Sequence, residues 1–86
     1  MDNNEIYLVH DRIRRIKVEI KYLQDRIELN KSIISKFKEL PSSIKNGLDE
    51  GTKGKSFISI NEKNIELCNY QLNNLYKALK ELESLK

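Results

Sequence analysis

The sequence contains no tryptophan, one proline, three glycines and one cysteine among its 86 residues. Because proline and glycine destabilise helix interiors, their scarcity favours long uninterrupted helices. Aromatic residues make up only 7% of the chain, which argues against a thick globular core. The single cysteine, Cys68, excludes an intramolecular disulfide framework, and with a single histidine, His10, it leaves no cluster of metal ligands. We therefore expect one small all-α domain over residues 1–86, with no metal and no cofactor.

The chain also lacks a long apolar segment. No run approaches the ~20 apolar residues that a membrane-spanning helix needs, and the first residues show neither the basic nor the apolar region of a secretory signal. The net charge of +3 is small, so an anionic partner is allowed without being required. These features predict a soluble, cytoplasmic protein that does not act at a membrane.

What the chain does have is a regular alternation of three- and four-residue steps between apolar positions. In its first half, the a positions of this heptad pattern are all isoleucine, namely Ile6, Ile13, Ile20, Ile27 and Ile34. The d positions are Val9, Ile16, Leu23, Asn30 and Phe37. A 3.5-residue period keeps one seam of a helix facing a partner helix, so the pattern predicts a coiled-coil helix over about residues 4–40. Pro41 ends this helix, because the residue before a proline disfavours helical dihedral angles.

The second half repeats this spacing. Its seam positions are Ile58, Asn61, Ile65, Cys68, Leu72, Leu75, Leu79 and Leu82. They predict a second helix over about residues 57–86, with Ser56 or Ser59 as its N-cap. The connection between the helices, residues 41–56, is rich in serine, glycine and lysine and is long for a helix–helix connection. We expect it to be irregular, with Ile44 and Leu48 spaced to place one apolar turn or a short helix against the end of the helix pair.

The two seams match when the helices run antiparallel. In this alignment Leu23 faces Leu72 and Ile20 faces Leu75, and each a position meets a d position along the seam. The flanking charges favour the same alignment, because those of the first helix bracket glutamates of the second: Lys31 and Lys38 bracket Glu62, and His10 and Lys17 bracket Glu83. The sequence therefore predicts a coiled-coil helical hairpin. Pairing of the helices between two chains is the alternative, since the long connection permits it.

Two seam positions are polar. Asn30 and Asn61 fall in adjacent layers of the antiparallel alignment. Either the two side-chain amides bond to each other, which would fix the register, or both are hydrated where the seam opens toward the connection.

A second apolar stripe follows the c and g positions. It comprises Leu8, Tyr22, Leu29, Ile33 and Leu40 in the first helix, and Ile60, Leu67 and Leu85 in the second. A hairpin alone leaves this stripe exposed, and contiguous exposed apolar surface usually marks an interface. We expect two hairpins to pair into a four-helix bundle, or the hairpin to dock on another protein. The partner-binding residues that we single out are Tyr22, Leu29, Ile33, Ile60 and Leu67. The function that this favours is a small non-enzymatic protein–protein interaction module, such as an adaptor, assembly factor or inhibitor.

The connection contains a short sequence, "DEGTKGKS", that ends like a phosphate-binding P-loop. A Walker A loop requires glycine five positions before Gly54, where this chain has Asp49, and no strand precedes the loop. Nucleotide chemistry is therefore not expected. The helix–bend–helix plan also resembles the small helical hairpins secreted by type VII systems, with "TKG" at the place of their Trp-x-Gly motif. That resemblance implies a secreted hairpin as an alternative, although Thr52 replaces the tryptophan and the C-terminal Tyr-x-x-x-Asp/Glu signal is missing.

The first half of the first helix is locally basic. Arg14, Lys17 and Lys21 share one helical face and are candidates for contact with an anion, which makes a nucleic-acid-binding helical dimer the competing function. Asp11, Glu19 and Asp25 are interspersed, and a solvated face explains the charges equally simply. No catalytic set of residues is recognisable, so we do not expect an enzyme.

Overall fold

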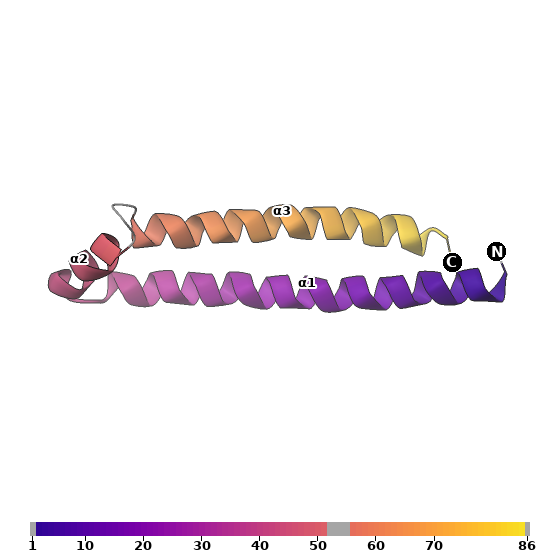
Figure 1. The fold of residues 1–86 in the computed structure, drawn as a ribbon, viewed down its shortest axis with the longest axis horizontal. Helices are drawn as coiled ribbons and strands as arrows, with labels where there is room; N and C mark the ends of the chain where they lie inside the picture. Colours follow the sequence, from indigo (N-terminus) through magenta and orange to yellow (C-terminus); the bar gives the residue numbers. More distant parts are fainter. Residues whose placement is uncertain (1, 52–55, 86) are drawn as a thin grey trace.

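The computed structural model describes residues 2–51 and 56–85. In these ranges the chain forms three helices: α1 (Asn3–Lys38), α2 (Ser42–Gly51) and α3 (Phe57–Glu83). No strand occurs in the described ranges, and the prediction of an all-α protein is confirmed. Figure 1 shows α1 and α3 side by side and antiparallel, with α2 at one end and the first turn of α1 near the last turn of α3 at the other.

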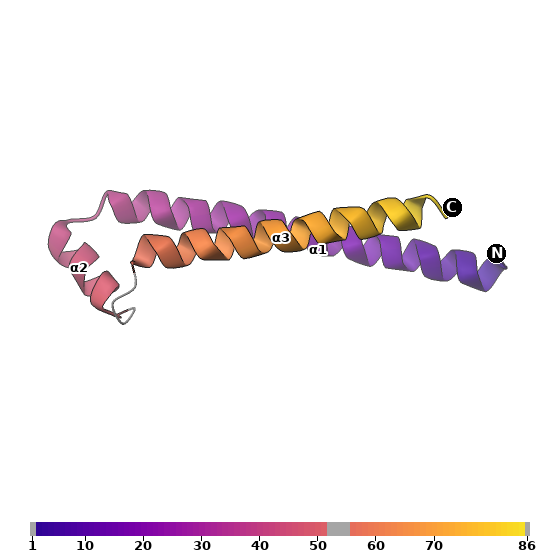
Figure 2. The same cartoon turned by 90° about the horizontal axis from the view of Figure 1, so that it is seen from above.

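The molecule is a narrow rod, 63 Å long and 19 by 16 Å across. Figure 2 shows that α3 crosses α1 at a shallow angle, as expected of helices whose side chains interlock along a seam. α1 has 36 residues and α3 has 27, and the extra length of α1 extends past the last turn of α3. For this reason the seam residue Ile6 remains 39% exposed, while Ile13 is buried.

The ends of the helices have local causes. At the start of α1, the Asp2 carboxylate accepts a hydrogen bond from the Glu5 amide at 2.8 Å, which satisfies one of the free N–H groups of the first turn. α1 ends at Lys38, two residues earlier than expected. The Pro41 carbonyl accepts hydrogen bonds from the amides of Ile44 and Lys45, so a new helix begins there. The expected irregular connection therefore contains a helix of ten residues, α2.

The core is the heptad seam. Its buried apolar residues are Ile13, Ile16, Ile20, Leu23, Phe37, Cys68 and Leu72, and Ile27, Leu75, Leu79 and Leu82 pack against them half-buried. One hydrogen bond joins the two helices beside this seam: Gln24 Nε2 donates to Tyr76 Oη at 2.8 Å. Gln24 follows the seam residue Leu23 and Tyr76 follows the seam residue Leu75, so both flank the seam on the same side.

The two seam asparagines are buried, at 6% and 7% exposure, but they do not bond to each other. Asn30 Nδ2 donates to the Arg26 carbonyl at 2.8 Å, and Asn61 Nδ2 donates to the Phe57 carbonyl at 2.8 Å. Each amide nitrogen therefore has its partner four residues back on its own helix. The expected mutual bond is wrong, and the expected hydration stays a prediction.

The expected interhelical ion pairs are also absent from the described residues. The ion pairs found there lie within α1 and join Asp11 to Arg14, Asp11 to Arg15, and Lys21 to Asp25. A flexible lysine gains little by reaching across solvent to the other helix, whereas a carboxylate one turn away on its own helix is already within range.

Candidate protein-docking face

Apolar side chains outside the seam lie where the sequence predicted them. Tyr22, Leu29 and Leu67 are 58%, 60% and 58% exposed, and Ile33 and Ile60 are half-buried. Apolar side chains exposed to this extent add little to the core of a single chain. They indicate an interface only if they lie next to one another on the surface.

Three of these five residues, Ile33, Ile60 and Leu67, line two shallow hollows near α2. One hollow is lined by Ile33, Lys36, Phe37, Leu40, Leu48 and Phe57. The other is lined by Ser59, Ile60, Lys63, Asn64 and Leu67. Phe57 lines the first hollow and Ile60 the second, and the two are three residues apart on one face of α3. Leu29 lies four residues before Ile33 on the same face of α1, which places it beside the first hollow. We call this surface the α2-end face: Leu29, Ile33, Leu40, Leu48, Phe57, Ile60 and Leu67.

Phe57 was missed by the sequence analysis, and Leu48 was expected only in an apolar turn or short helix against the end of the helix pair. Phe57 is the first residue of α3, and its ring stacks on Phe37 with centroids 4.8 Å apart. Leu48 belongs to α2, which brings it from a separate segment to the mouth of the same hollow. The signal for Phe57 was present in the sequence, because it occupies the g position that precedes the seam residue Ile58, as Ile33 precedes Ile34.

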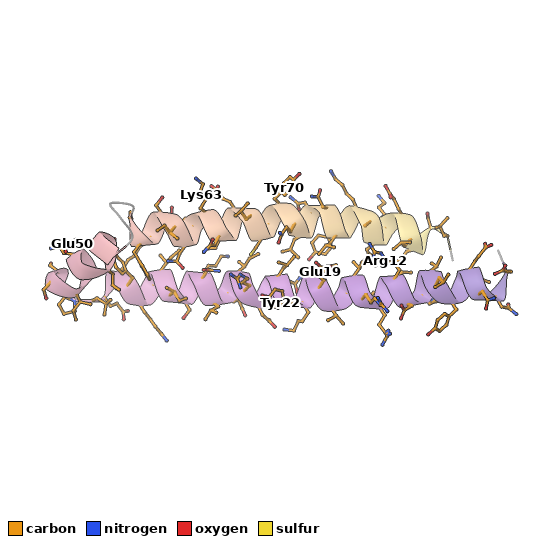
Figure 3. All side chains as sticks on the ribbon, in the orientation of Figure 1. Arg12, Glu19, Tyr22, Glu50, Lys63 and Tyr70 are labelled. Atoms are coloured by element: carbon orange, nitrogen blue, oxygen red, sulfur yellow. The ribbon has the colours of Figure 1, made fainter. Side chains whose placement is uncertain are left out.

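The side chain of Tyr22 lies apart from this group. It projects from α1 two turns before Leu29, and its hydroxyl oxygen accepts a hydrogen bond from Arg26 Nη1 at 3.2 Å. Figure 3 labels Tyr22, Arg12 and Glu19 along α1, where Arg12 and Glu19 are exposed, and Lys63 and Tyr70 on the side of α3 away from α1. The docking residues predicted from the sequence therefore form a cluster of four and one separate tyrosine.

The junction of α2 and α3 is closed by a carboxylate. Asp49 Oδ1 accepts a hydrogen bond from the Phe57 amide at 2.8 Å, and the Ser56 side chain accepts one from the Ser59 amide. Ser56 is thus the N-cap, one of the two caps that the sequence allowed. A negative charge already occupies the helix end where a phosphate would bind. Thr52, Lys53, Gly54 and Lys55, which carry the P-loop-like and Trp-x-Gly-like motifs, lie outside the described residues.

The predicted basic residues do come together. Arg14, Lys17 and Lys21 line one open hollow with His10, Ile13 and Val18. Arg14 Nη2 lies 2.7 Å from Asp11 Oδ1, and Lys21 Nζ lies 2.7 Å from Asp25 Oδ1. The hydrogen bond to Asp11 raises the pKa of Arg14, and that to Asp25 raises the pKa of Lys21. Both stay cationic, but both charges are partly compensated, and Lys17 alone of the three has no ion pair among the described residues.

No group of three or more histidine, cysteine, aspartate or glutamate side chains in the described residues is arranged to hold a metal ion. No helix in the described ranges has the length and apolar character needed to cross a membrane. No protein-family model, curated protein or solved structure matches the chain. The α2-end face and the basic hollow are therefore the two features of the described residues that bear on function.

Proposed function

We propose that the protein is a small non-enzymatic protein–protein interaction module of the cytoplasm, an adaptor, assembly factor or inhibitor. In this proposal α1 and α3 form a coiled-coil helical hairpin that serves as a rigid support, and the α2-end face is the docking surface. The observation that carries the proposal is the exposure of Leu29 and Leu67 beside the half-buried Ile33 and Ile60. Helical partners bind such surfaces by laying an apolar stripe into the groove between two helices.

The position of the face supports a docking role. Its apolar residues come from all three helices, so its shape depends on the fold and not on one flexible segment. Lys36 and Lys63 stand at the edges of the two hollows, which gives the face the polar rim that protein interfaces have. A partner helix of four-helix-bundle geometry would complete this arrangement.

The test compares two variants with the wild-type protein. Leu29→Gln with Leu67→Gln makes the face polar without removing helix formers, and Val18→Gln changes an equally exposed residue, 68% exposed, on another side of α1. Each protein is immobilised, and the proteins that it retains at micromolar concentration are identified and their affinities measured. We expect a partner that binds wild type and Val18→Gln alike and loses at least tenfold in affinity for the double variant. Retention of every partner by the double variant would refute the role of the face.

A second candidate is nucleic-acid binding through the basic hollow. It is favoured by one observation, that Arg14, Lys17 and Lys21 line the same hollow. Binding of a short duplex or single strand should then weaken steeply with added salt, and Lys17→Gln should reduce the slope by about one. Absence of retention on either nucleic acid at low salt would eliminate this candidate.

A further inference from the structure

The surface that contains the α2-end face changes character along the rod. Near α2 its c and g positions are mostly apolar. Farther toward the start of α1 the same positions are mixed. They are polar or charged at Arg12, Arg15, Glu19, Gln71, Asn74 and Glu81, and apolar at Leu8, Tyr22, Ala78 and Leu85. A partner that covers the whole surface must therefore be mostly apolar at one end and largely polar and charged at the other. This chain has such a surface itself.

We propose that the partner is a second copy of this chain, packed face to face about a two-fold axis that runs along the rod, so that both α2 helices lie at the same end. The inference rests on the proposed docking function of the α2-end face. It specifies the occupant of that face and the direction in which the occupant lies.

The register within one chain provides the first argument. Ile27 and Cys68 belong to the same core cluster and face each other in the antiparallel alignment of the seams. In this alignment Leu29 and Leu67 lie at nearly the same height along the rod. A two-fold axis along the rod preserves heights and places α1 of one copy over α3 of the other. Leu29 then packs on Leu67 of the second copy, and the apolar ends of the two surfaces cover each other.

The charges provide the second argument. In the same arrangement Arg15 stands at the height of Glu81 of the second copy, because these residues occupy c positions two heptads beyond Leu29 and Leu67. The Arg15 side chain is 72% exposed, and its Nε lies 3.0 Å from Asp11 Oδ2. The guanidinium has further N–H donors, so it can keep this contact and also reach Glu81 of the second copy. This end of the surface therefore offers one complementary pair, Arg15 with Glu81, on each side of the axis.

The opposite direction is less favourable. An axis across the rod would place the apolar end of one copy on the charged end of the other, which buries arginines and glutamates without partners. If the copies slide until only their apolar ends overlap, no charged residue is buried, but the contact area falls to about half of that at full overlap. A surface 63 Å by 19 Å offers on the order of 1,000 Å² per copy at full overlap, against the roughly 800 Å² per partner of a standard interface.

The first experiment measures mass by light scattering over a hundredfold range of concentration. We expect a dimer whose dissociation constant rises at least tenfold in Leu29→Gln with Leu67→Gln and stays within twofold in Val18→Gln. Circular dichroism verifies that both variants are helical. A monomer throughout the range would overturn the inference and leave the proposed function standing, with another protein as the occupant. A dimer that the double variant does not weaken would overturn both.

The second experiment determines the direction. Spin labels are attached in separate samples to Asn46→Cys in α2 and to Asn4→Cys in the first turn of α1, both exposed positions. Cys68 is 5% exposed, and wild-type protein treated in the same way serves as the blank. Two copies with helix axes ~10 Å apart keep like labels within about 40 Å at both ends of the rod. A separation near 60 Å or more at the Asn4 site would place the axis across the rod and overturn the inference.

Discussion

Replacing the buried amide of Asn30 with an apolar side chain should stabilise the protein. Asn30 is 6% exposed, and its amide nitrogen makes one hydrogen bond, to the Arg26 carbonyl, which as a helix carbonyl already serves the backbone. Leucine branches at the same carbon and has a similar size. Asn30→Leu loses about 1 kcal/mol of hydrogen bonding. It removes a desolvation cost of about 1–3 kcal/mol and adds about 1.5–3 kcal/mol of apolar burial.

After incomplete packing is allowed for, the net gain should be about 1–3 kcal/mol, which raises Tm by about 4–8 °C for each kcal/mol in a domain of this size. Denaturant unfolding followed by circular dichroism at one fixed protein concentration measures the change. The control is Asn73→Leu, the same substitution at an exposed position of α3, which should gain only a few tenths of a kcal/mol from helix propensity. An Asn30→Leu variant that is no more stable than wild type would show that burial of the Asn30 amide carries no net cost in unfolding free energy.

Three further predictions concern the core, α2 and the ion pairs. Leu72→Ala, at a position 6% exposed, should lower the unfolding free energy by about 2–5 kcal/mol, whereas Val18→Ala, at an exposed position, should lower it by less than about 0.5 kcal/mol. Near-equal losses in the two variants would refute the assigned core. Gly47→Ala places a Cβ in open space within α2 and should add about 0.5–1 kcal/mol, seen as higher Tm or helicity; a loss of both would contradict a helical α2. The hydrogen bond from Arg14 lowers the pKa of Asp11 below its usual 3.8. The ionised Asp11 therefore stabilises the folded protein above pH 3.8, and this stabilisation is lost as the pH falls through the lowered pKa. Asp11→Asn should therefore be less stable than wild type at pH 7 and equal to it near pH 2, and a difference that persists in acid would disprove this.

Part of the candidate site could be predicted because its signals are periodic. Tyr22, Leu29, Ile33, Ile60 and Leu67 follow from the heptad positions, and their exposure follows from lying outside the seam. The separation of Tyr22 from the other four follows from the same spacing, because it lies seven residues, two helical turns, before Leu29. The hydrogen bond from Arg26 to the Tyr22 hydroxyl could not be predicted. Rotamers and donor geometry decide such contacts, and they leave no mark in the spacing of residue types.

The contribution of α2 to the candidate site could be predicted only in part. Ile44 and Leu48 suggested an apolar turn, but the segment has the serine and glycine content of a loop. Leu48 reaches the hollow beside Phe57 because α2 follows directly from Pro41 and its Asp49 carboxylate binds the Phe57 amide. A bond between residues eight apart, which spans a helix boundary, requires the tertiary arrangement to bring its two groups together.

The sequence by itself determined that the protein is helical and which residues form the seam, because a 3-4 spacing of isoleucine and leucine has no other stable use than a helix that buries one stripe. Only the tertiary structure decided how the polar groups are satisfied. The side chains of Asn30 and Asn61 donate to backbone carbonyls of their own helices. Asp11 pairs with Arg14, and Asp25 pairs with Lys21, each about one turn away on α1. The physical reason is range: apolar burial is set by the pattern along a whole helix, whereas a hydrogen bond depends on tenths of an ångström between particular atoms.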